Sequence, residues 1–152
     1  MPKRHHGELE GLVKRVRAFN RFYTRQIGLL NEGLYGSRFS LTEVRVLFEI
    51  WCRNETTATV VLGELGLDAG YLSRMLRRFE KARLIHRRRS KADGRQNQIS
   101  LTARGLKAFL PLEARADADV GQMLKGLSAM QHKTLVRAMA AVQGLLSRRD
   151  HR

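Results

Sequence analysis

Hydrophobic residues recur every three or four positions along most of the chain, which is the spacing of one face of an α-helix. The first such series, Leu9–Leu34, predicts one long helix that Gly33 and Gly36 help to end. Further series cover Leu106–Leu127 and Leu135–Leu146. With two prolines in 152 residues, the pattern predicts a mainly α-helical protein.

Polar residues that can cap a helix mark where the central elements begin. Ser40–Glu43 is typical of a capping box, at the start of a helix that runs to about residue 53. Thr57 can cap a short helix that ends near Gly66, and Asp68 can cap the next one. Two short helices joined by a tight turn predict a helix-turn-helix over residues 57–81. Ser128–Gln131 is a second capping box near the end of the chain.

A different pattern follows the helix-turn-helix. Leu84–Arg89 and Gln96–Leu101 have the character of strands, and the polar segment Ser90–Arg95 separates them. They predict a β-hairpin, or wing, over residues 84–101, after which Thr102 begins another helix. The expected fold class is therefore mainly α with a small β-hairpin. It is a winged helix-turn-helix in a single domain, residues 9–147, with long helices at 9–34 and 102–147.

The long terminal helices carry apolar stripes wider than a small core can absorb. Burial against a second copy of the chain is the common solution, and a two-fold dimer is the commonest closed form. The sequence therefore predicts a homodimer. We expect the first helix and the last helix to form its interface; the last helix contributes Leu135, Met139, Val142 and Leu146.

Charge narrows the range of partners. The formal net charge is +15, and residues 71–104 hold eleven Lys or Arg against two acids. Such a balance predicts a polyanion as partner, with nucleic acid first and an anionic membrane surface second. No apolar run approaches the roughly 18 residues that span a bilayer, so no membrane partner is expected. Positive charge within a winged helix-turn-helix favours double-stranded DNA.

The candidate DNA-binding residues lie on two elements. The second helix of the helix-turn-helix and its start contribute Asp68, Ala69, Gly70, Tyr71, Ser73, Arg74, Arg77 and Arg78. Residues 70, 73, 74, 77 and 78 share a face at helical spacing, where an arginine can bind guanine O6 and N7 in the major groove. A solvated basic face is the plainer interpretation of the same residues.

The wing contributes Arg87, Arg88, Arg89, Lys91, Asp93 and Arg95. Arg95 is the candidate for the minor groove, with Asp93 orienting it through a charge-assisted hydrogen bond. An ordinary Asp-Gly turn explains the same spacing. The other basic residues of the wing are expected to clamp phosphates without reading sequence.

Other chemistry is poorly supported. Cys52 is the only cysteine, so an internal disulfide and a thiolate zinc site are excluded. The five histidines have no partners at ligand spacing, and the chain shows no nucleophile–base set or phosphate-binding glycine loop. We therefore expect neither an enzyme nor a cofactor. The polar start of the chain is unlike a signal peptide and predicts a cytoplasmic protein.

Specific residues in the wing carry a family resemblance. Asp93-Gly94-Arg95, followed by Ile99-Ser100-Leu101-Thr102 and Gly105, resembles the D-x-R and L-T-x-x-G pattern of the MarR family of bacterial transcription factors. The resemblance covers nearly the whole chain, residues 9–146. The segments 17–27 and 67–74 are most similar to a subgroup in which this domain is fused to an acetyltransferase. One position departs from the pattern, because Arg83 stands where the family usually has glycine.

The resemblance implies a homodimeric repressor that binds an inverted repeat and responds to a ligand. Small anionic, phenolic or aromatic effectors bind such proteins in a cleft, for which this chain offers Arg17, Phe19, Tyr23, Arg45 and Trp51. Some members sense peroxides through cysteine. Cys52 lies outside their first helix, however, and core filling next to Trp51 is the plainer expectation for it.

Two alternatives stay open. An architectural DNA-binding protein of low sequence specificity suits a net charge of +15 equally well. A regulator should prefer its own site over random duplex by about 10³ or more, and this ratio distinguishes the two. A partner-binding module without DNA function would require the basic face to be incidental.

Overall fold

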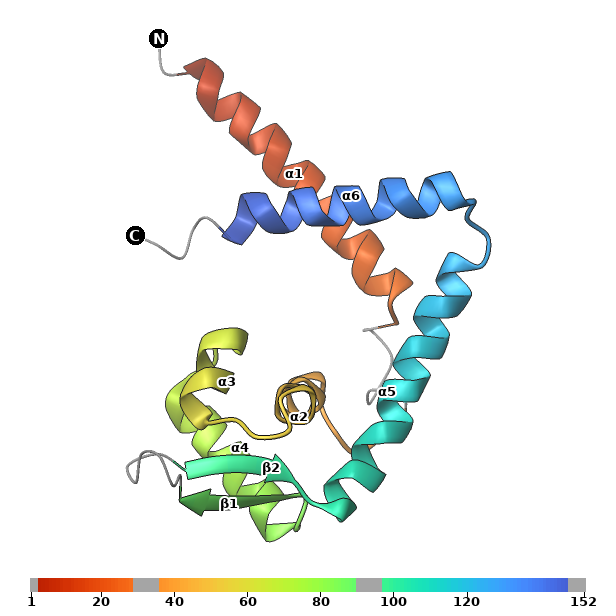
Figure 1. Cartoon of the computed structure of the whole chain (residues 1–152). Coiled ribbons are helices and arrows are strands. Elements are labelled where there is room, and N and C mark those ends of the chain that lie inside the picture. Colours follow the sequence, from red (N-terminus) through yellow and green to blue (C-terminus); the bar gives the residue numbers. More distant parts are fainter. Residues whose placement is uncertain (1–2, 29–35, 90–96, 148–152) are drawn as a thin grey trace. The chain divides into compact units, whose positions relative to one another are not determined.

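The computed structural model describes residues 3–28, 36–89 and 97–147, which form six helices and two strands. Their order is α1 (Lys3–Gln26), α2 (Leu41–Cys52), α3 (Ala58–Leu65), α4 (Ala69–Lys81), β1 (Ile85–Arg89), β2 (Asn97–Leu101), α5 (Ala103–Leu124) and α6 (Ala129–Leu146), as Figure 1 shows. Residues 1–115 and 116–152 make two compact units. The fold is a winged helix-turn-helix flanked by long helices, as the sequence predicts.

The core of the first unit is built around α2. Figure 1 shows this helix almost end-on, with α3 and α4 to one side and the hairpin below. Side chains with no more than 3% exposure fill the space between these elements and the start of α5: Val46, Leu47, Ile50, Val61, Leu72, Met75, Leu76, Phe79, Leu84, Ile85, Ile99 and Phe109. Their burial anchors the helix-turn-helix on a rigid support.

The helix starts predicted from the sequence are confirmed. Ser40 and Glu43 form a reciprocal capping box on α2, and Ser128 and Gln131 form another on α6. Thr57 caps α3 by accepting a hydrogen bond from the backbone N–H of residue 60. At the other end of α3, Gly66 takes a left-handed conformation with φ 59°, which glycine adopts without steric cost.

The wing is an antiparallel hairpin in which Ile85 pairs with Leu101 and Arg89 with Asn97. A feature that the sequence did not reveal extends it. Thr56, just before α3, forms a two-bond bridge with Ile99, with N···O distances of 3.0 and 2.7 Å. The bridge ties the loop between α2 and α3 to β2.

The base of the wing is packed tightly against α5. Thr102 donates a hydrogen bond from its backbone N–H to the Leu84 carbonyl, 2.9 Å, and its hydroxyl lies 2.6 Å from the Arg83 carbonyl. A β-carbon added at Gly105 would lie 2.0 Å from the Leu84 carbonyl oxygen. Only glycine therefore allows α5 to approach the start of β1 this closely.

The first helix differs from its prediction. The expected end at Leu34 is wrong, because α1 ends at Gln26 and a turn follows, with Gly28 at φ 71°. The turn breaks the helical spacing before Leu30 and Gly33, which lie outside the described residues together with the rest of 29–35. Gly36 is described, and its φ of 69° suits the break between helices that was expected there.

Candidate nucleic-acid interface

The start of α4 is held by its own cap. The Asp68 carboxylate accepts a hydrogen bond from the Tyr71 backbone N–H over 2.8 Å and so caps the helix. The carboxylate also lies at the positive end of the helix dipole, which stabilises it there. Asp68 thus has a structural task in addition to any contact with DNA.

The apolar side of α4 sets which residues face outward. Leu72, Met75, Leu76 and Phe79 are buried, with exposures of 0–3%. At 100° per residue, the position opposite this face belongs to Gly70, Arg74, Arg77 and Lys81. The structure leaves all four exposed. We call Gly70, Arg74 and Arg77 the outer face of α4.

The two arginines of the outer face have different surroundings. Arg77 Nη2 lies 3.4 Å from the Ser73 hydroxyl, to which it donates a hydrogen bond. Arg74 Nη1 lies near Gly70, where an added β-carbon would be 3.5 Å from it, an ordinary van der Waals distance. Both guanidinium groups are on exposed residues.

Arg78 lies at one edge of the expected face, about 70° from the centre of the outer face, as Ser73 does on the other side. Its side chain is exposed. Its Nη2 donates a hydrogen bond to Glu43 Oε1 over 2.9 Å. This ion pair joins α4 to α2.

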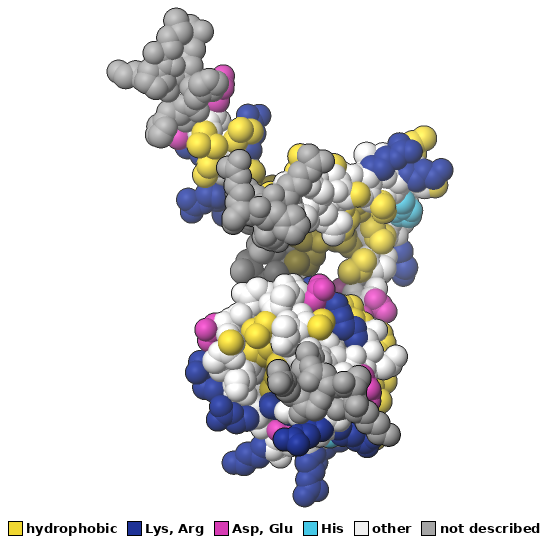
Figure 2. All heavy atoms as spheres, turned by 60° about the vertical axis from the view of Figure 1, so that its left-hand side comes forward, with side chains coloured by type: hydrophobic (Ala, Val, Ile, Leu, Met, Phe, Trp, Pro, Cys, Tyr) yellow, Lys and Arg dark blue, Asp and Glu magenta, His cyan; other side chains and the backbone are white. Residues whose placement is uncertain are grey.

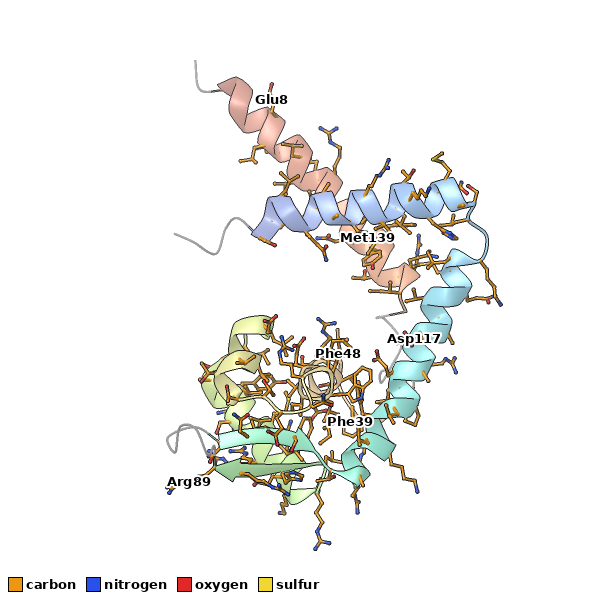
Figure 3. The ribbon with its side chains drawn as sticks, in the orientation of Figure 1. Glu8, Phe39, Phe48, Arg89, Asp117 and Met139 are labelled. Carbon is orange, nitrogen blue, oxygen red and sulfur yellow. The ribbon has the colours of Figure 1, made fainter. Side chains whose placement is uncertain are left out.

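The arginines of the wing differ in their exposure and in their partners. Arg88 and Arg89 are exposed, and Figure 3 shows Arg89 pointing away from the body at the end of β1. Arg87 is half-buried, and its Nε lies 3.5 Å from a carboxylate oxygen of Glu80 on α4. This ion pair joins the wing to α4. Lys91, Asp93 and Arg95 lie outside the described residues.

Basic side chains gather on part of the surface. Figure 2 shows Lys and Arg side chains, in dark blue, along the lower part of the winged-helix body. Within the wing, His86 and Ser100 share a hydrogen bond of 2.8 Å across the hairpin. The arrangement offers a rigid helix and a rigid hairpin, each with exposed guanidinium groups.

The residues expected to line an effector cleft lie on several elements. Phe19 and Tyr23 stack on α1 with ring centroids 5.8 Å apart. Arg45 lies over the Phe48 ring at 5.7 Å, while Trp51 packs against Phe109 at 5.5 Å. A small cavity of about 80 Å³ touches one residue of the set, Trp51. Its other lining residues are Ile50, Asn54, Leu101 and Leu106.

Cys52 does not fill the core, and that expectation is wrong: its side chain is exposed at the end of α2. Arg53 Nη1 lies 3.3 Å from its sulfur. The same arginine pairs with Glu49 and, at 3.2 Å, with Glu64 on α3. The hydrogen bond with Glu49 is the main cause that raises the pKa of Arg53.

Comparison with known proteins finds a family match over part of the chain. The family model described as "MarR family" matches residues 39–96. HTH-type transcriptional regulator MgrA of Staphylococcus aureus is 33% identical over 93 residues, which cover 60% of this chain and 58% of that protein. The organic hydroperoxide resistance transcriptional regulator of Bacillus subtilis is 38% identical over 101 residues, 66% of this chain and 65% of that protein. The alignment thus spans less than two thirds of either relative.

Solved structures of MarR proteins match the fold of this chain. A crystal structure of a mutant MarR from E. coli, complexed with operator DNA, matches with a TM-score of 0.69 and 26% sequence identity. The match covers 87% of this chain and 95% of that one. The chain is thus similar to MarR-family proteins over residues 39–96 and in its fold. The relatives that it matches are named as transcriptional regulators.

Several residues that make contacts around the candidate site were missed by sequence reasoning. Glu43 was recognised only as part of a capping box, while Glu80 and Thr56 carried no signal at all. Their partners lie 7 to 43 positions away along the chain, so no local pattern reveals them. Within the described residues, no group of three or more His, Cys, Asp or Glu is placed to hold a metal ion. No described helix is long and apolar enough to cross a membrane.

Proposed function

We propose that the protein is a sequence-specific regulator of transcription that binds double-stranded DNA as a homodimer. The observation that carries the proposal is the outer face of α4, where Arg74 and Arg77 are exposed next in sequence to a basic wing. In this account α4 lies in the major groove and the wing reaches the flanking backbone and minor groove.

In this proposal the basic residues have two roles. Readers contact base edges, and clamps contact phosphates. Arg74 and Arg77 have the exposure to bind a guanine with two hydrogen bonds. Arg88 and Arg89 on β1, with Lys91, are clamps for phosphate, and Arg95 enters the minor groove with Asp93 orienting it. Tyr71, Ser73 and Ala69 flank the readers, and Asp68 holds the helix end toward the duplex. Arg78 and Arg87 act mainly through their acidic partners.

The dimer explains the exposed hydrophobic side chains of the terminal helices. On α1 they are Leu9, Leu12, Val13, Val16, Phe19, Phe22 and Tyr23. On α6 they are Met130, Val136, Met139, Val142, Leu145 and Leu146. Exposed apolar surface of this extent on two helices is typical of an interface. A two-fold dimer would read an inverted repeat with half-sites about 10 base pairs apart.

Repression by covering a promoter, released by a small anionic or aromatic effector, is the form of regulation that we propose. Arg17 and Arg45 would supply the positive charge, and Phe19, Tyr23 and Trp51 the aromatic surface, of an effector site. The support is the chemistry of these side chains and the similarity of the chain to the MarR family.

The proposal is tested by comparing Arg74→Ala with Arg88→Ala on a preferred duplex and on random duplex, over a series of salt concentrations. Loss of a reader should cost about 1–3 kcal/mol on the preferred duplex and less on random DNA. Loss of a clamp should weaken binding to both alike and flatten the salt dependence by about one unit per contact per subunit. Equal proportional losses for both variants on both duplexes would favour the architectural alternative.

A further inference from the structure

Glu43 uses both of its carboxylate oxygens on different elements. Oε2 accepts a hydrogen bond from the Ser40 backbone N–H over 2.9 Å and so completes the capping box of α2. Oε1 accepts from Arg78 Nη2 on α4, also over 2.9 Å, across 35 positions of sequence. The Glu43 side chain is 17% exposed and that of Arg78 is 61% exposed. The acid is therefore the fixed partner, and the arginine is the one that it holds.

Glu43 is fixed because the helix that carries it is fixed. It occupies the third position of α2, and Val46, Leu47 and Ile50 of the same helix have no exposed surface. A helix buried to this degree cannot rotate or slide without opening a cavity. The carboxylate therefore gives α4 a reference point on the scaffold.

The contact made by Arg78 complements the apolar packing of α4. The four buried side chains of α4 already restrain its depth and its rotation, as buried packing does for α2. A charge-assisted hydrogen bond has a preferred direction. Because Arg78 lies on the flank of α4, its bond to Glu43 opposes rotation of the helix. Rotation would carry Arg74 and Arg77 with it.

We propose that Glu43 is a positioning residue for DNA recognition: through Arg78 it sets the rotation of α4 and so the aim of Arg74 and Arg77. Glu43 itself does not touch DNA, and its negative charge opposes the approach of phosphate. The inference rests on the proposed function. Its consequence is that Glu43 raises sequence preference while lowering affinity for DNA in general.

Glu43→Gln tests this with little disturbance of the fold. Glutamine at the third position of a helix also completes a capping box, so α2 keeps its start. A single amide oxygen, without charge, cannot serve Ser40 and Arg78 as the two carboxylate oxygens do. The control is Glu64→Gln, which removes the same charge from α3, where Glu64 is paired with Arg53 at 3.2 Å.

The measurement is affinity for a preferred duplex, selected with the wild-type protein, and for random duplex, together with the thermal midpoint of each variant. For Glu43→Gln we expect affinity for random duplex to rise about twofold, because one negative charge is lost. We expect the ratio of the two affinities to fall about tenfold, the effect of one misaimed base contact. Glu64→Gln should leave the ratio unchanged.

A double-mutant cycle with Arg78→Gln shows whether Glu43 acts through Arg78. In the Arg78→Gln background, Glu43→Gln should no longer lower the ratio. Equal changes on both duplexes would mean that Glu43 acts only by charge, and a parallel loss of affinity and thermal midpoint would mean that it acts only on stability. Either result overturns the proposal, as does an unchanged ratio. A wild-type protein without any preference would instead overturn the proposed function, and this inference with it.

Discussion

Gly105 is the residue at which the fold leaves no space for a side chain. In Gly105→Ala the added β-carbon would meet the Leu84 carbonyl oxygen at 2.0 Å, and backbone on both sides must move. We expect the free energy of unfolding to fall by about 1–3 kcal/mol or more, the range for overpacking. Chemical denaturation measures it. Gly63→Ala is the matched control: nothing lies within 4 Å of its β-carbon, so helix propensity should make this variant equally or slightly more stable.

Arg83 is a position where a glycine would fit better than the residue present, because its backbone takes a left-handed conformation with φ 58°. Glycine adopts this conformation without the steric cost that an arginine bears. Arg83→Gly should therefore raise the free energy of unfolding by about 0.5–1 kcal/mol, after the greater freedom of glycine in the unfolded chain is subtracted. Asn54, at φ 59°, provides a comparison. Asn54→Gly should raise the free energy of unfolding by less, since asparagine tolerates the left-handed region. Equal increases for the two variants would contradict backbone strain at Arg83 as the cause.

Residue roles could be predicted where they depend on neighbours in sequence. The caps Ser40, Thr57 and Asp68 follow from a polar side chain two or three positions before the N–H that it accepts from. The Glu43–Arg78 pair could not be predicted, because its partners are 35 positions apart. The exposure of Cys52 could not be predicted either. Its neighbour Trp51 is partly buried, but the Cys52 side chain is exposed.

Among the elements, α4 has to satisfy both folding and recognition, and Asp68 at its start shows the conflict. Its carboxylate caps the helix, and in the proposed function it would lie close to phosphates of the duplex. Asp68→Asn keeps a good cap, so the free energy of unfolding should change little, while the loss of negative charge should strengthen binding to random duplex. Asp68→Ala loses the cap and should cost about 1 kcal/mol. If both variants bind random duplex as wild type does, α4 does not start beside the DNA.

The elements themselves were largely predictable because their signals are local. The alternation and the polar loop of the wing predicted a hairpin, and the observed register keeps Ile85 and Ile99 in the core. The end of α1 was not predictable from spacing alone: apolar residues continue at helical intervals beyond Gln26, but Gly28 already takes a left-handed turn. The bridge between Thr56 and Ile99 involves a single residue pair, in which Thr56 lies outside any strand, and so it leaves no pattern in the sequence.

For the whole molecule, the proposed function covers the exposed apolar faces of α1 and α6 with a second copy of the chain. In sedimentation at micromolar concentration the protein should behave as twice its 17.4 kDa chain mass. Leu12→Glu or Leu145→Glu places a charge in the interface and should shift the equilibrium toward the monomer. Val60→Glu introduces the same charge at an exposed position of α3 and should leave the dimer intact. A wild-type protein that sediments only as a monomer would contradict this arrangement.

Sequence preference is the central claim, and one measurement tests it most directly. The purified protein selects bound fragments from random DNA, and competition then compares the selected duplex with random duplex at one fixed salt concentration. We predict an inverted repeat with half-sites about 10 base pairs apart, bound about 10³-fold or more tightly than random DNA. Selected fragments without a common sequence, bound no more tightly than random duplex, would contradict the account and identify an architectural DNA-binding protein.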